Sequence, residues 1–153
     1  MILTGGSVVS FYSGERNVSK DIDLVIVLFA KRPKIRKAMK ELGFRQRGRH
    51  FEHPDSEYPV EFPGGPPSVG SESIGEVQEY EFQTGTLKIL SPTDCVKDRL
   101  AAFFHWNDRQ SLEQAIMDVQ DQQIDLDEVE RWSEAEGKSK EFHEIKKRLM
   151  NAI

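Results

Sequence analysis

The strongest structural signal in the chain is the segment from Asp21 to Leu28, which is Asp-Ile-Asp followed by five apolar residues. Beyond Asp23 it is continuously apolar and rich in β-branched residues, a pattern typical of a strand buried on both faces. We therefore expect a central strand here. Any fold must also accommodate Asp21 and Asp23 at the start of this strand, because carboxylates beside an apolar strand are costly unless positive charge lies near them.

Strand and helix patterns alternate through the rest of the first half. Residues 1–4 predict a strand that ends at Gly5-Gly6, and Ser7 is a suitable N-cap for the short helix that follows. Pro33 opens an apolar stripe that predicts a second helix. Further strand patterns lie at 44–53, 58–62, 77–82 and 86–90, with a hairpin signal between the last two.

The second half has a helical pattern throughout. Ser91-Pro92-Thr93-Asp94 is typical of a capped helix start, and Asp125, with an acid three residues on, predicts another. Apolar residues at helical spacing predict the buried faces of three helices. These faces are formed by Val96, Leu100, Phe103 and Phe104, by Leu112, Ile116 and Val119, and by Phe142, Ile145 and Leu149. Strands followed by helices indicate an α+β fold. We divide it into an α/β core over 1–90 and a helical region over 91–153, packed together as one compact unit.

The aspartates at the head of the strong strand are candidate metal ligands. Asp21 and Asp23 are two residues apart, so on a strand both carboxylates project from one face, about 7 Å apart. A divalent cation would stabilise them, and a donor set of oxygen alone favours Mg²⁺ or Mn²⁺ over zinc. The alternative is a solvated strand end or a helix cap.

A glycine turn upstream is a candidate phosphate site. Gly5 and Gly6 stand at a strand-to-helix junction, where glycine lets the backbone approach a phosphate and the helix amides point towards the anion. Ser7 follows directly. Turns of this composition are also common without a ligand.

Together the two motifs resemble the DNA polymerase β-type nucleotidyltransferase superfamily. Its signature is a Gly-Gly or Gly-Ser turn that opens a helix, then Asp-x-Asp on the next strand. Here these are Leu3-Thr4-Gly5-Gly6-Ser7 and Lys20-Asp21-Ile22-Asp23-Leu24-Val25. They are most similar to the AbiEii-like bacterial branch, which is often found in toxin–antitoxin and phage-defence settings. The resemblance covers about the first sixty residues, is looser in the helical half, and implies a mixed sheet with flanking helices.

The resemblance also implies further site residues. The superfamily adds a third carboxylate, usually Asp, from a nearby strand; here the candidate is Glu61, and otherwise it is an exposed strand residue. Asp55 and Glu57 are the other choices. Two cations complete the nucleotide site: Arg16, which either steadies phosphates or pairs with Glu15 or Asp21, and Lys97, which otherwise lies on a solvated helix face.

The implied activity is transfer of an NMP from an NTP to a hydroxyl of RNA, protein or a small molecule. Two Mg²⁺ or Mn²⁺ ions, held by Asp21, Asp23 and Glu61, would stabilise the entering and leaving oxygens. The backbone of Gly6 and Ser7 would help to hold the triphosphate. The alternative is a protein of the same fold with weak or no catalysis, which binds as an antitoxin or accessory subunit.

Composition excludes several other classes. The 153 residues suit one domain, and a single cysteine, Cys95, excludes an intramolecular disulfide framework. No apolar run approaches the roughly 20 residues that span a bilayer, and no signal-peptide pattern is present. We therefore expect a cytoplasmic protein without a membrane partner.

The net charge of −5 conceals a basic segment over 31–50. This segment holds nine Lys and Arg residues against Glu41 alone, a net +8, so the other residues carry −13. Such a run is often a solvated helix face, but it can also attract a polyanion. Because it follows the candidate metal strand, we expect an RNA or protein acceptor near it.

The sequence begins four residues before Gly5, whereas relatives in the superfamily usually have a helix ahead of this strand. We expect a homodimer or a partner subunit to supply the packing surface that such a helix would provide.

Overall fold

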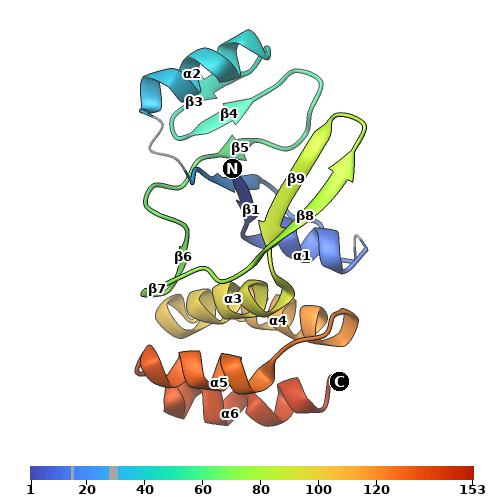
Figure 1. The fold of residues 1–153 in the computed structure, drawn as a ribbon, viewed down its shortest axis with the longest axis vertical. Coiled ribbons are helices and arrows are strands. Elements are labelled where there is room, and N and C mark those ends of the chain that lie inside the picture. The colour runs from blue at the N-terminus through green and yellow to red at the C-terminus, as the bar shows by residue number, and fades with distance from the viewer. Residues whose placement is uncertain (15, 28–30) are drawn as a thin grey trace.

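The computed structural model describes residues 1–14, 16–27 and 31–153 and has the expected α+β fold class (Figure 1). The described helices are α1 (Gly6–Tyr12), α2 (Arg32–Glu41), α3 (Pro92–Trp106), α4 (Arg109–Asp121), α5 (Leu126–Ala135) and α6 (Ser139–Met150). The described strands are β1 (Ile2–Thr4), β2 (Ile22–Val25), β3 (Arg45–Arg47), β4 (His50–Glu52), β5 (Val60–Glu61), β6 (Ser68–Val69), β7 (Glu72–Ser73), β8 (Val77–Phe82) and β9 (Gly85–Leu90).

A mixed sheet of seven strands organises the first part of the chain, in the order β3-β4-β5-β2-β1-β9-β8. β2 is antiparallel to β1 and parallel to β5, so it lies inside the sheet, as the apolar run predicts. The expectation of burial on both faces is wrong, because all four residues of β2 are only half-buried. Its Ile22 and Leu24 line an open cleft instead. Leu28 lies outside the described residues.

Helix α1 begins two residues earlier than the capping pattern predicts, since an N-cap at Ser7 would start it at Val8 and it starts at Gly6. Its N-cap is Gly5 with φ of +70°, a conformation that glycine adopts without steric cost. Ser7 is therefore not the cap. Its hydroxyl donates to the backbone oxygen of Asp21 at 2.5 Å, which ties the first turn of α1 to the chain entering β2. Val8 and Val9 of α1 are buried in one apolar cluster with side chains of β1 and β9.

The segment 44–53, expected as one strand, forms the β3–β4 hairpin. Gly48 reverses the chain with φ of +60°, and Gln46 then pairs with Phe51 in antiparallel register. Phe51 is buried together with Met39 of α2, so this apolar contact holds α2 on the hairpin.

The helices of the second half begin where the capping residues predict. Ser91 Oγ accepts a hydrogen bond from the Asp94 amide at 3.2 Å, and Asp125 Oδ1 accepts one from the Glu128 amide at 3.0 Å. The predicted apolar stripes of α3 to α6 form one core around the fully buried Trp132.

The α/β core (1–90) and the helical region (91–153) are in contact at two places. Gln114 Nε2 of α4 donates to Asn17 Oδ1 at 3.2 Å, beside α1. The β6–β7 hairpin, although early in the sequence, packs on the helices, because Trp132 Nε1 donates to the Val69 carbonyl at 3.2 Å. In Figure 1 this hairpin lies next to α3 and apart from the large sheet. No helix in the described ranges is long and apolar enough to cross a membrane.

Candidate functional site

Asp23 and Glu61 are brought together by the sheet. They are direct partners in the parallel register of β2 and β5, so their side chains leave the same face. The pKa of Asp23 is raised to about 6, first by burial and then by the charges of Asp21 and Glu61, against a lowering by Arg99. Asp21 and Glu61 therefore each lie close enough to Asp23 to repel its charge.

The start of α1 lies against this cluster. A Cβ on Gly5 would lie 2.5 Å from Asp23 Oδ2, so only glycine allows the carboxylate this close to the helix N-terminus. A Cβ on Gly6 would lie 3.1 Å from Ser19 Oγ. The same Ser19 hydroxyl donates to Asp21 Oδ1 at 3.3 Å. The glycine turn and the Asp-x-Asp motif thus lie side by side.

Glu61 is contacted by Arg49 and His50 of the β3–β4 hairpin. Arg49 Nε lies 3.3 Å from Glu61 Oε1, and His50 Nδ1 lies 2.5 Å from the same oxygen, without hydrogen-bond geometry. In residues 1–14, 16–27 and 31–153, no three His, Cys, Asp or Glu side chains converge to hold a metal ion as they stand. A metal ion held by this set would compete with Arg49 and His50 for the Glu61 carboxylate.

The two cations expected at the nucleotide site have other partners. Arg16 pairs with Asp121 of α4, and the alternative partner Glu15 lies outside the described residues. Lys97 is buried between Asp94, at 3.3 Å, and Glu128 of α5, at 2.6 Å. The structure does not bring either side chain to the three carboxylates.

Arg99 of α3 acts on Asp23 through its charge, which lowers the pKa of that carboxyl. Its guanidinium is bound by Asp98 and, at 3.3 Å, by Gln114 Oε1. Lys97 is three residues after Asp94, the spacing of an intrahelical ion pair, so the sequence offered a signal that Lys97 is paired within its own helix. It offered no signal that selects Arg99.

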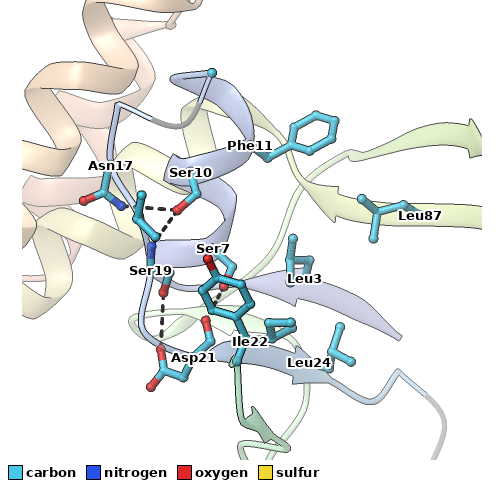
Figure 2. Close-up of a pocket in the computed structure, with 13 residues that line it drawn as sticks. Leu3, Ser7, Ser10, Phe11, Asn17, Ser19, Asp21, Ile22, Leu24 and Leu87 are labelled. Carbon is cyan, nitrogen blue, oxygen red and sulfur yellow. Dashed lines mark hydrogen bonds between the residues drawn. The ribbon is translucent and has the colours of Figure 1, made fainter. Parts of the chain in front are cut away.

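A cleft of about 860 Å³ adjoins the site (Figure 2). Its floor is apolar, with Leu3, Ile22 and Leu24 at the centre, and its polar end includes Ser7 and Asp21. Leu3 pairs with Leu24, whereas the adjacent pair is Thr4 with Asp23. Because successive side chains alternate, the apolar floor and the Asp23 carboxylate belong to opposite faces of the sheet.

No protein-family model, curated protein or solved structure matches the chain. The superfamily resemblance therefore stays a prediction, and the function has to be inferred from the geometry of the chain itself.

Proposed function

We propose that this protein is a metal-dependent nucleotidyltransferase with the polymerase β-type fold, of the AbiEii-like kind. The observation that carries the proposal is the pairing of Asp23 with Glu61 across β2 and β5, beside the glycine-opened start of α1. Carboxylates next to a helix N-terminus suit a metal ion and a phosphate bound side by side. Its expected association with toxin–antitoxin or phage-defence systems is part of the same proposal.

The donor set fits Mg²⁺ or Mn²⁺. Asp21, Asp23 and Glu61 offer only carboxylate oxygen, and the pKa of Asp23 is raised first by burial and then by the charges of the other two. When bound, divalent ions would supply the charge that stabilises the reacting oxygens. Arg49 and His50 both contact Glu61 at Oε1, and a divalent cation would have to compete with them for this carboxylate.

In the proposed reaction, an acceptor hydroxyl oxygen forms a bond to the α-phosphorus of an NTP. The bond from that phosphorus to the β-phosphate bridging oxygen breaks, and pyrophosphate leaves with the electron pair. The hydroxyl proton passes to a carboxylate, for which Glu61 is the candidate. The backbone of Gly6 and Ser7 would hold the phosphates, since their amides lie in the first turn of α1.

One observation favours a second candidate, a binding protein with the same fold and little or no catalysis. Glu61 already has an ion pair with Arg49 and a close contact with His50, and a carboxylate paired in this way has less need of a metal. Such a protein would bind NTP and act as an antitoxin or accessory subunit.

An NTP labelled at the α-phosphate separates the two candidates. The protein is incubated with the label, Mg²⁺ or Mn²⁺, and cellular RNA or protein. We expect transfer by the wild type and none by Asp21→Asn/Asp23→Asn. The control Asp127→Asn/Glu134→Gln removes the same charge at exposed positions of α5 and should keep full transfer. NTP binding without label transfer or pyrophosphate release would identify the binding protein instead.

The cleft supports the expected homodimer or partner subunit. Its floor is apolar and open, and Tyr58 and Val18 at its border are 41% and 62% exposed. Open apolar surface of this kind marks an interaction site. Light scattering should therefore report a species larger than the 17.5 kDa chain, or a partner in native complexes, and Leu24→Glu should disrupt either. A wild-type monomer that recruits no partner would contradict this.

A further inference from the structure

The large sheet has two open edges. Its outer strands are β3 and β8, and no strand in the described ranges pairs with the outer side of either. All three residues of β3 are exposed, and β8 is six residues long and exposed at its end. Figure 1 shows β8 and β9 as a long hairpin at the right of the molecule. An open strand edge offers unpaired backbone groups to a further strand.

The two edges carry opposite charge on the same face of the sheet. Glu79 and Glu81 are the charged residues of β8, and Arg45 and Arg47 are those of β3. Because successive side chains of a strand alternate, the registers across the sheet place all four on the face from which Asp23 projects. All four are exposed to solvent.

Neither edge is fully neutralised by the strand next to it. A lysine of β9 contacts Glu79, whereas Glu81 accepts a hydrogen bond from a threonine hydroxyl at 2.8 Å and has no ion pair among the described residues. At the other edge a glutamate of β4 lies 3.0 Å from Arg47, and Arg45 likewise has no ion pair in the described part of the chain. One negative charge on β8 and one positive charge on β3 therefore lack a partner.

These charges determine which edges of two copies can meet. Two copies joined at β8 would bring Glu79 and Glu81 of one copy opposite those of the other, and two copies joined at β3 would do the same with Arg45 and Arg47. Like charges opposite each other destabilise a strand pair, whereas opposite charges stabilise it. Charge therefore favours β8 of one copy beside β3 of the next.

The directions of the strands allow the same arrangement. The parallel and antiparallel pairs across the sheet give β3 and β8 the same direction. A second copy shifted along the sheet, with the same face towards the viewer, sets its β3 parallel to β8 of the first. In this position Arg45 lies beside Glu79 and Arg47 beside Glu81, so the charges match in register.

The same position would cover an exposed aromatic ring. Phe82 is 53% exposed and follows Glu81, so it projects from the other face of the sheet. That is also the face of Phe51, on which α2 packs through Met39. Helix α2 of the second copy would therefore lie on the side of Phe82 of the first, where its long lysine and arginine side chains can pack on the ring.

We propose that a second copy of this chain adds its β3 strand to β8, with Arg45 and Arg47 of one copy beside Glu79 and Glu81 of the other. The two copies contribute different surfaces, so each keeps one free edge and the sheet can continue from copy to copy. The contact includes only the three residues of β3, so we expect weak association that increases with concentration. This inference does not depend on the proposed transferase function.

Charge reversal tests the contact by sedimentation equilibrium. Glu79→Arg/Glu81→Arg makes both edges basic, and Arg45→Glu/Arg47→Glu makes both edges acidic. Between about 20 µM and about 500 µM, we expect each variant alone to associate at least tenfold more weakly than wild type, and an equal mixture of the two to regain wild-type affinity. Net charge does not explain such recovery, because each reversal changes the charge by two and the variants carry −1 and −9.

The matched control reverses two exposed acids away from both edges. Glu134→Arg/Glu144→Arg, on α5 and α6, has the same net charge as the β8 variant, and neither residue has an ion pair within the described structure. It should associate like wild type. All variants should keep the circular dichroism spectrum of wild type, since every substituted residue is exposed.

Four results would overturn the inference. They are a wild type that stays at 17.5 kDa throughout, equal losses in the control, a mixture that does not associate, and wild-type association in both edge variants, which would place the contact at the cleft. If wild type stays monomeric but binds a peptide of alternating Lys and Val at β8, the edge takes another protein instead. Label transfer without self-association refutes this inference alone, and self-association without transfer refutes the transferase alone.

Discussion

Asp23 and Glu61 face each other across two parallel strands, and a Cβ on Gly5 would collide with the first of these carboxylates. This relationship joins three sequence motifs that come from separate parts of the first region. It also sets the charge balance of the site, because burial and neighbouring carboxylates keep the pKa of Asp23 near 6.

Metal affinity should depend on pH through Asp23. A ligand carboxylate must be ionised, and with a pKa of about 6 the Asp23 carboxyl is largely protonated at pH 5 and ionised at pH 7.5. We expect Mn²⁺ to bind about tenfold more weakly at pH 5 than at pH 7.5, measured by calorimetry. Asp23→Asn should bind weakly at both values. If Mn²⁺ bound with the same affinity at both pH values, Asp23 would not be a ligand of the metal.

Gly5→Ala should damage both folding and metal binding. The new Cβ would stand 2.5 Å from Asp23 Oδ2 at a residue with φ of +70°, so we expect a loss of about 2–3 kcal/mol of unfolding free energy in urea. Gly14→Ala is the matched control, since Gly14 has φ of +59° and open space around it, and should cost about 1 kcal/mol. If both variants lost the same unfolding free energy, the contact with Asp23 would not contribute to the effect of Gly5→Ala.

Asp118 should make the protein less stable as the pH rises. It is fully buried on α4, and among the described residues neither of its oxygens has a hydrogen-bond partner. Burial raises its pKa to about 7, although the Cys95 thiol and the Arg99 charge act against the rise. Between about pH 4 and pH 7 the unfolded chain has lost this proton and the folded chain retains it, so unfolding becomes easier with increasing pH.

The variant Asp118→Asn removes that dependence. Relative to wild type, its unfolding free energy should increase by up to about 4 kcal/mol between pH 4 and pH 7.5, and level off above that. Urea titrations at five pH values measure it. Comparison across pH cancels the constant cost of a buried amide, and parallel curves for the two proteins would refute the prediction.

Lys97 should contribute to stability and not to nucleotide binding. Its ammonium is buried between Asp94 and Glu128, so Lys97→Met leaves Asp94 buried without its cation and should cost about 3–5 kcal/mol. The exposed pair of Lys88 with Glu79 is the control, and Lys88→Met should cost less than about 1 kcal/mol. The NTP affinity of the folded Lys97→Met variant, measured at low temperature, should equal that of wild type. A large loss of NTP affinity would show instead that Lys97 takes part in nucleotide binding.

Local signals predicted the fold better than they predicted the site. The caps at Ser91 and Asp125 and the β8–β9 hairpin depend on neighbouring residues, and they form where the sequence indicates. Gly48 shows the limit of strand patterns, because one residue with positive φ divides an expected strand into a hairpin.

The site depends on pairing between distant segments, which a sequence pattern does not determine. The register that puts Glu61 opposite Asp23 and the packing that turns Lys97 towards α5 are set by tertiary contacts. Arg49 and His50, which hold Glu61, carried no signal in the sequence because β3–β4 was expected to be one strand. The buried charge of Asp118 is likewise a product of helix packing.

The contacts of Arg49 and His50 with Glu61 connect the β3–β4 hairpin to the proposed metal site. Both residues contact the same oxygen, Oε1, so a metal ion that drew this oxygen away would also remove two side-chain contacts between the hairpin and β5. The hairpin would then respond to metal binding without supplying a ligand.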